Sequence, residues 1–438
     1  MFCRILAAAA ATMSAPLAAQ TAPATTYIHA GQMLGEPGKA PRGASTIIVR
    51  DGKVAEVRDG FVQPEGGARV IDLKTRFVLP GLIDMHVHIS SDDNLLRSRL
   101  EGTQRDIEDV FVIAQGNARR TLEAGFTTVR DLGGDGRTTT TLRDAIAAGA
   151  IVGPTIIPAG SMVSVTGGHG GVNGLNRTLT RAVTEERNNM CDGAEGCASA
   201  VRAQISVGAE VIKFAATGGV RSNVAGGLGK QMTDAEMKAV VDTAHSFGRK
   251  VTAHAHGKDG IDAALRAGVD SIEHGSFIDD ETVRLFKAEN AALVPTAVAP
   301  IAALAQARRG DAPAPQLAKA EEAGAAHAAS LQRAVKGGVR ILFGTDSGVA
   351  PHGENAKEFA LLVKAGMTPA QAIKAATLDS ALELERPIGA ILPGRDADIV
   401  AVAGNPLEDV TLLERVDFVM RRGVVHKADG RRQPFPPE

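Results

Sequence analysis

The central part of the chain alternates between short apolar runs and longer amphipathic stretches. The runs lack the strict polar–apolar alternation of a half-exposed strand, so they are typical of parallel strands buried on both faces. The stretches have helical spacing. One of them, Asp234–Phe247, follows a capping Thr233, has Glu236 in capping-box position and ends at Gly248. The apolar runs are Leu82–His88, Thr127–Leu132, Thr155–Gly160, Val211–Thr217, Val251–Gly257, Ser271–Ser276, Leu293–Val298 and Ile341–Ser347.

Buried strands that alternate with helices in this way indicate an α/β fold built from βαβ units. The eight runs listed above predict a closed (β/α)8 TIM barrel over residues 81–385. A doubly wound open sheet is the competing architecture. The dinucleotide-binding version of that fold is disfavoured, because no Gly-x-Gly-x-x-Gly pattern follows the first run.

Both ends of the chain have a different pattern, in which short β runs are separated by Gly-rich turns. Asp51-Gly52 is typical of a hairpin turn. Neither end carries enough strands for a domain of its own, so we expect residues 21–80 and 386–438 to meet in one small β-sandwich. The β runs are Thr46–Arg50, Lys53–Val57, Arg69–Asp72, Ala397–Val402, Val416–Met420 and Gly423–His426.

Residues 1–20 have the outline of a secretory signal peptide. Arg4 gives a short positive region, Ile5–Ala15 is a run of small apolar residues, and Pro16–Gln20 offers small residues to a signal peptidase. The apolar run is shorter than the roughly 20 residues that a transmembrane helix needs. We therefore expect export to the periplasm or the medium, the alternative being an Ala-rich helix of the folded domain.

Cys191 and Cys197 are separated by a short segment that contains two glycines. Such a segment closes tightly, and the oxidising compartment expected for an exported protein permits a disulfide. The spacing does not match that of zinc ribbons. A disulfide is the prediction, and two free thiols are the alternative.

Composition and charge point to a small-molecule partner. The chain has 438 residues, 44% of them hydrophobic, a formal net charge of −2 and 3% aromatic residues, with no Trp. It has no long basic run for a phosphate backbone and few aromatic rings on which bases would stack. Nucleic acid and a membrane surface are therefore not expected as partners.

Residues that can bind metals lie toward the C-terminal ends of the predicted strands, where barrel enzymes have their active sites. His86 and His88, two residues apart, face the same side of a strand. A single histidine there is ordinarily a core residue, and Lys213 could pair with a carboxylate to offset the cost of burying its charge. Their convergence on one barrel mouth predicts a metal site. The candidates are His86, His88, Lys213, His254, His274 and Asp346.

Two further histidines are candidates for contact with a substrate. His169 lies in a Gly-rich segment after the third predicted strand, and His352 follows the eighth. Both segments leave the predicted barrel at the end where the metal candidates lie. The remaining histidines are expected to be structural or solvated: His29, His245, His327 and His426.

The motifs Gly81–His88, Ile272–Gly275 and Gly344–Asp346 resemble those of the amidohydrolase superfamily. The branch that the chain resembles is that of imidazolonepropionase-like proteins and Xaa-Pro dipeptidases, which includes ochratoxin-degrading amidohydrolases. The likeness extends from about Tyr27 to the C-terminus and includes Ala397–Val400. As a combination these motifs are specific for the superfamily and much less so for any substrate.

The resemblance implies two divalent metal ions bridged by a carboxylated Lys213 (N6-carboxylysine). A carbamate is an anionic oxygen ligand, which removes the problem of a buried ammonium. Zinc is the expected metal, with manganese or cobalt also compatible with the ligands. The ligands of one ion would be His86, His88 and Asp346, and those of the other His254 and His274.

The resemblance also implies a mechanism. Two ions share and activate one hydroxide, and the more exposed ion polarises the scissile carbonyl. Asp346 takes the proton of the attacking hydroxide and delivers it to the departing amine. His256 is expected to contact the substrate, and Arg221, after the fourth strand, is placed to bind a carboxylate, with a solvated loop arginine as the alternative.

We therefore expect a binuclear amidohydrolase that cleaves a dipeptide of the Xaa-Pro type or an N-acyl amino acid and releases a C-terminal amino acid. The expected partners are the small-molecule amide substrate and further copies of the chain in a homo-oligomer. The alternatives are a hydrolase of cyclic amides and a non-catalytic, exported protein that binds a metal or ligand. Asp346 favours an enzyme, because binding alone does not need a proton carrier.

Overall fold

The computed structural model describes residues 25–91, 94–134, 136–172, 175–312 and 314–435. The predicted signal peptide at residues 1–20 lies outside the described residues. Within the described part of the chain, every helix is too short or too polar to cross a bilayer.

The centre of the molecule consists of parallel strands in two sheets. One sheet has the order β5-β6-β7 and the other the order β12-β11-β10-β9-β8. Within each sheet, strands that follow one another in the chain are paired in parallel. The strands are β5 (Leu82–Val87), β6 (Phe126–Asp131), β7 (Thr155–Pro158), β8 (Val211–Ala215), β9 (Lys250–Ala255), β10 (Ser271–His274), β11 (Ala292–Val294) and β12 (Arg340–Ile341).

Backbone hydrogen bonds join the two sheets at both of their edges. Between β7 and β8, Val163 donates to the carbonyl of Lys213 at 2.8 Å and accepts from Ala215 at 2.9 Å. Between β5 and the segment after β12, Met85 donates to Phe343 at 2.8 Å, and His88 donates to Ser347 at 2.7 Å. The carboxyl ends of strands from both sheets therefore lie at a common end of the molecule.

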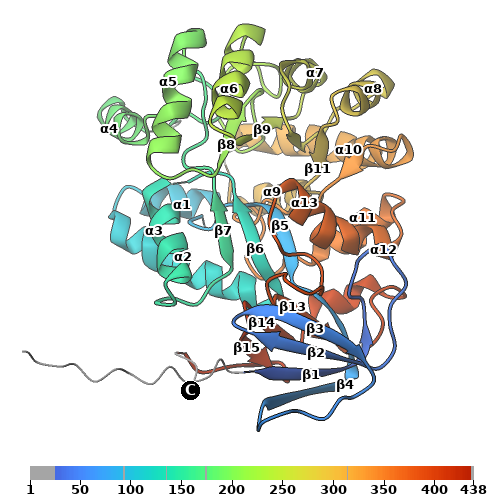
Figure 1. The fold of residues 1–438 in the computed structure, drawn as a ribbon. Helices are drawn as coiled ribbons and strands as arrows, with labels where there is room; N and C mark the ends of the chain where they lie inside the picture. The colour runs from blue at the N-terminus through green and yellow to red at the C-terminus, as the bar shows by residue number, and fades with distance from the viewer. Residues whose placement is uncertain (1–24, 92–93, 135, 173–174, 313, 436–438) are drawn as a thin grey trace, which may run out of the picture.

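Helices surround the parallel strands (Figure 1). The predicted capping box is confirmed in α6 (Asp234–Ser246), where Thr233 accepts from the amide of Glu236 and Glu236 accepts from the amide of Thr233. The other helices are α1 (Leu95–Glu101), α2 (Ile107–Glu123), α3 (Gly136–Ala147), α4 (Arg177–Arg187), α5 (Gly193–Ser206), α7 (Lys258–Ala267), α8 (Asp280–Ala288), α9 (Val298–Arg309), α10 (Ala314–Lys336), α11 (Lys357–Lys364), α12 (Pro369–Lys374) and α13 (Ser380–Glu383), with a π-helical turn η1 (Ala375–Asp379) and a 3-10 turn η2 (Val410–Glu414).

The two ends of the chain meet in one sheet of eight strands, drawn in blue and red at the bottom of Figure 1. Its order is β16-β15-β14-β13-β4-β1-β2-β3. β4 pairs with β1 on one side and with β13 on the other, so the strands of both chain ends belong to one hydrogen-bonded sheet, and the structure does not show the predicted β-sandwich as two separate sheets. These strands are β1 (Thr26–Met33), β2 (Ser45–Arg50), β3 (Lys53–Asp59), β4 (Arg69–Pro80), β13 (Ile399–Val402), β14 (Phe418–Arg421), β15 (Val424–Ala428) and β16 (Arg431–Arg432).

The parallel strands end earlier than the apolar runs predicted. His274, Thr296 and Asp346 have φ angles of 72°, 51° and 58°, in the left-handed region. A residue with that φ leaves the β conformation, so β10 ends at His274, whereas Thr296 and Asp346 lie in the segments that follow β11 and β12. Val298, predicted as the end of a strand, is the first residue of α9.

Candidate metal centre

A cavity of about 380 Å³ opens at the carboxyl ends of the parallel strands. Its polar lining comes from β5, β8, β9 and β10 and from the segments that follow β9 and β12. The sequence-predicted residues that line it are His86, His88, Lys213, His254, His256, His274, Asp346, His169 and Arg221. His352 is not among the described residues that line it.

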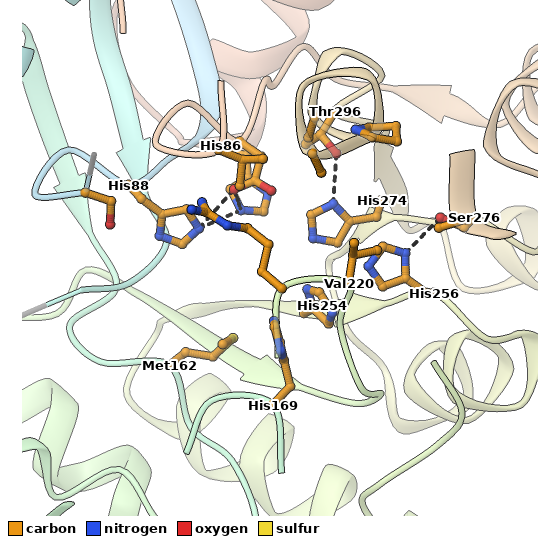
Figure 2. A pocket seen from close by; sticks show the side chains of 18 of the residues that line it. His86, His88, Met162, His169, Val220, His254, His256, His274, Ser276 and Thr296 are labelled. Atoms are coloured by element: carbon orange, nitrogen blue, oxygen red, sulfur yellow. Dashed lines mark hydrogen bonds and ion pairs between the residues drawn. The ribbon is translucent and has the colours of Figure 1, made fainter. Parts of the chain in front are cut away.

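The metal-binding candidates form two groups inside this cavity. Ligand atoms of His86, His88 and Asp346 lie within 4.8 Å of one another, and those of His254, His256 and His274 form the second such group. Figure 2 shows the two groups of histidines on opposite sides of the cavity. The rings of His86 and His274 bridge the groups, with centroids 5.1 Å apart.

In the first group, hydrogen bonds fix which ring nitrogen faces the cavity. His88 Nδ1 lies 2.6 Å from the carbonyl of Gly133, and His86 Nδ1 lies 2.7 Å from the Glu273 carboxylate. Both partners only accept, so Nδ1 donates in each ring and Nε2 keeps its lone pair. The two Nε2 atoms lie 3.3 Å apart, and His88 Nε2 lies 3.1 Å from Asp346 Oδ1. This geometry suits one cation.

The second group has hydroxyl partners. His274 Nδ1 lies 2.8 Å from Thr296 Oγ1, and His256 Nδ1 lies 2.8 Å from Ser276 Oγ, as the dashed lines in Figure 2 show. His254 makes only a long contact of 3.4 Å with the carbonyl of Gly218. His256 belongs to the same group, so its ring lies beside the candidate ligands His254 and His274.

Burial keeps most of these rings neutral, which is the form that binds metals. It lowers the pKa of His86 to about 4 and that of His256 to about 3, and it holds the pKa values of His254 and His274 well below the usual value. Burial also disfavours charge on His88, but the adjacent Asp346 carboxylate outweighs it and raises the pKa.

Lys213 and Asp346 provide a test of whether the residues fit a metal. Lys213 is 1% exposed, and neither its Nζ atom nor Oδ1 of Asp346 has a hydrogen-bond partner among the described residues. Burial lowers the pKa of Lys213 to about 8. Burial opposes ionisation of Asp346, yet His86, His88 and Lys213 lower its pKa to about 2. An ionised carboxylate and a buried amine without partners suit divalent cations.

Glu273 was not identified as a candidate from the sequence, although it directly precedes His274. It is fully buried, and besides His86 it accepts hydrogen bonds from Arg130 at 2.7 Å and from Thr252. Burial opposes its ionisation, but Arg130, Lys213 and His86 lower its pKa to about 2. A carboxylate in the middle of a buried apolar strand was the available signal. Its role is to orient His86.

His169 packs beside the second group. Its ring stacks on that of His254 with centroids 4.1 Å apart, and burial lowers its pKa to about 3. Gly219 makes this possible, because a Cβ atom there would lie 2.3 Å from the His169 ring. His352 instead lies buried behind His88, with its Nε2 atom 3.2 Å from the His88 carbonyl.

The structure also places Arg221, His327 and the two cysteines predicted to form a disulfide. Arg221 lines the cavity and donates to the carbonyl of Gly348 at 2.9 Å. His327, expected from the sequence to be structural or solvated, is buried and also lines the cavity. A disulfide joins Cys191 and Cys197.

The chain matches the model of the amidohydrolase family over residues 77–426. It is 33% identical to an ochratoxinase of Aspergillus niger over 426 residues, covering 92% of this chain and 87% of that protein. A solved structure of an Xaa-Pro dipeptidase with methionine in its active site is 35% identical, with a TM-score of 0.84 over 92% of this chain and all of the other. A prolidase in complex with N-methylphosphonate-L-proline is 29% identical, with a TM-score of 0.84 over 93% and 100%.

Proposed function

Since the chain belongs to the amidohydrolase family, we propose that it uses two divalent metal ions to hydrolyse an amide bond. The proposed substrate is an Xaa-Pro dipeptide or an N-acyl amino acid, from which the C-terminal amino acid is released. The observation that carries the proposal is the pair of donor groups in one cavity, with a buried Lys213 amine that lacks a partner. The relatives named for ochratoxin, Xaa-Pro peptides and proline support this substrate class.

Lys213 would supply the bridge between the two ions. A pKa of about 8 leaves part of the amine neutral near pH 7, and only the neutral amine attacks CO2. The new Nζ–C bond gives a carbamate anion and releases one proton. Since Lys213 is buried among ligands from both donor groups, the two new oxygens would be available to an ion on each side.

When bound, the two ions would lower the pKa of a water molecule and polarise the scissile carbonyl. The chain's own residues do the rest. Asp346, the ionised carboxylate of the first group, would take the proton of the attacking water and give it to the departing nitrogen. The neutral His256 ring faces the cavity and is placed to hydrogen-bond the substrate.

We infer further that the two parallel sheets are parts of one closed barrel spanning residues 81–385. The support is the chain order of the eight strands and the backbone bonds at both gaps, from Val163 to Lys213 and from His88 to Ser347. A closed barrel places the donors of strands far apart in the sequence at one mouth.

The first test is metal content. Elemental analysis of the fully loaded protein is expected to find about two divalent ions per chain, because the two donor groups and Lys213 exceed one tetrahedral site. Zinc is the expected metal, with manganese and cobalt as alternatives. A stoichiometry of one ion in saturated protein would contradict the binuclear proposal.

The walls of the cavity support an anionic substrate with an apolar acyl group. Among the described lining residues, Asp346 is the only acid, whereas Arg187 and Arg221 add positive charge. Much of the remaining wall is apolar, and its described residues include no aromatic ring other than histidine, which leaves room for a bulky group. These wall residues are Met162, Val220, Ala299, Pro300, Ala303, Ala323 and Val349.

The second test concerns the free carboxylate of the leaving amino acid. Amidation of that carboxylate is expected to lower kcat/KM by at least about tenfold, because a charge-assisted hydrogen bond contributes about 1.5–3 kcal/mol. Arg221→Ala should shrink the difference between acid and amide, whereas the exposed Arg308→Ala should not. Equal cleavage of acid and amide would show that no carboxylate site exists, and a cyclic amide would then be the substrate to test.

The third test concerns export, which we propose from the pattern of residues 1–20. Intact mass of the protein from its native host is expected to place the first residue near Gln20 or Thr21. Alkylation without reduction should leave Cys191 and Cys197 unmodified, because they form a disulfide. Retention of Met1, together with labelling of both thiols, would contradict export and the disulfide.

A further inference from the structure

The turn between β11 and α9 determines how His274 faces the cavity. Thr296 in this turn is buried and has a φ of 51°. Its Oγ1 atom lies 2.7 Å from the carbonyl of Pro295 and 2.8 Å from His274 Nδ1. The hydroxyl has one proton and the carbonyl only accepts, so Thr296 donates to Pro295 and accepts from the N–H of His274. His274 Nε2 therefore keeps its lone pair for a metal.

A buried carboxyl group also holds this turn. Glu358 of α11 is fully buried, and its two oxygens accept from the amides of Ala297 and Val298, each at 2.8 Å. These amides stand at the start of α9, where helical N–H groups lack partners within the helix. Among the described residues, no cationic side chain forms an ion pair with Glu358.

Burial without a counter-charge disfavours the ionised form of Glu358 and raises its pKa to about 8. An N-cap side chain accepts from the second or third amide of a helix, so it would not replace the bonds that Glu358 makes to Ala297 and Val298. Glu358 comes from about 60 residues further along the chain. His327 of α10 holds the same turn, since its Nε2 atom lies 2.7 Å from the Pro295 carbonyl. The contacts from α10 and α11 hold Thr296 in its strained backbone conformation.

We propose that Glu358 is a positioning residue for the second metal-binding group, acting through the turn 295–298 and the Thr296 hydroxyl on the orientation and tautomer of His274. The inference rests on the proposed function, because it takes His274 as a ligand. Glu358 does not line the cavity, so its effect passes through the turn and not through contact with a substrate.

Metal retention tests the proposal directly. Fully loaded wild-type, Glu358→Ala, Glu358→Gln and Thr296→Val proteins are dialysed against graded chelator, and the ions per chain are counted. Glu358→Ala is expected to bind one of the two ions about 10–100-fold more weakly than the wild type, so that this ion is lost at a higher free metal concentration, and to keep the other ion. Thr296→Val should match it, and Glu358→Gln, which keeps one acceptor, should be intermediate. The matched control is Glu354→Gln, because Glu354 is exposed and pairs with Lys357.

A double variant shows whether the residues act through one path. Glu358→Ala combined with Thr296→Val should lose the ion no more readily than either single variant. Unchanged retention in folded Glu358→Ala would overturn the proposal, and so would loss of both ions in parallel with a lower Tm. If Glu358→Ala fails to fold, Glu358→Gln and Thr296→Val give the same decision.

The tautomer of His274 separates this inference from the proposed function. Protein labelled with ¹⁵N-histidine and freed of metal is compared by NMR, with the His274 signals identified by their absence in His274→Asn. Wild type should show the Nδ1–H form, and Glu358→Ala a mixture of forms. An unchanged tautomer would overturn the inference even if two ions bind. A wild type that binds fewer than two ions would overturn only the binuclear proposal, because this measurement needs no metal.

Discussion

Lys213→Ala is expected to lower kcat/KM by at least about a thousandfold, equivalent to roughly 4 kcal/mol of transition-state stabilisation. The variant removes the bridge proposed between the two ions. It leaves space beside both donor groups, because Lys213 is fully buried in the cavity. Steady-state kinetics and elemental analysis should therefore show loss of activity together with loss of metal.

Two further measurements separate a carbamate from a buried ammonium. Short carboxylic acids are expected to restore part of the activity of Lys213→Ala, because they supply oxygen ligands where the carbamate stood. Lys213→Arg keeps the positive charge but cannot react with CO2, so it should be as inactive as the alanine variant. Activity near that of the wild type in Lys213→Arg would show that Lys213 acts only through its charge. Lys238→Ala, on the exposed face of α6, is the control.

Asp346→Asn is expected to lower kcat by about 10²–10⁴-fold, the usual contribution of a placed acid–base group. Asparagine keeps the shape and one oxygen acceptor of aspartate but cannot accept the proton of the attacking water. The measurement is kcat at saturating substrate with metal in excess, so that weaker ligation is compensated. Asp242→Asn, at an exposed ion pair with Lys238, serves as control. Turnover within about fivefold of the wild type in metal-loaded Asp346→Asn would exclude this proton transfer.

Much of the site follows from the sequence because its donors lie at the ends of buried strands. His86, His88, Lys213, His254 and His274 are each in or next to an apolar run, and parallel strands bring their carboxyl ends together. The number and order of these runs also predicted the α/β class, and the short β runs at both ends of the chain predicted that the two ends meet.

The residues that orient the donors were not predictable in the same way. Arg130, Glu273 and Thr296 contact the donors or their partners across strands, and a single sequence carries no record of such pairs. Among the described residues, the hydrogen bonds that Glu358 accepts come from backbone amides, so no partner side chain marks them in the sequence. The end of β10 coincides with a left-handed φ angle at His274, which local propensity disfavours and tertiary contacts impose.

The shared terminal sheet has a consequence for synthesis on the ribosome. β4 pairs with β13 through Leu79 and Val400, so one edge of β4 has no partner until nearly the whole chain has been made. At about 5–20 residues per second, that interval is on the order of 15 to 60 seconds. During it, strands β1 to β4 expose an open edge that other nascent chains can join.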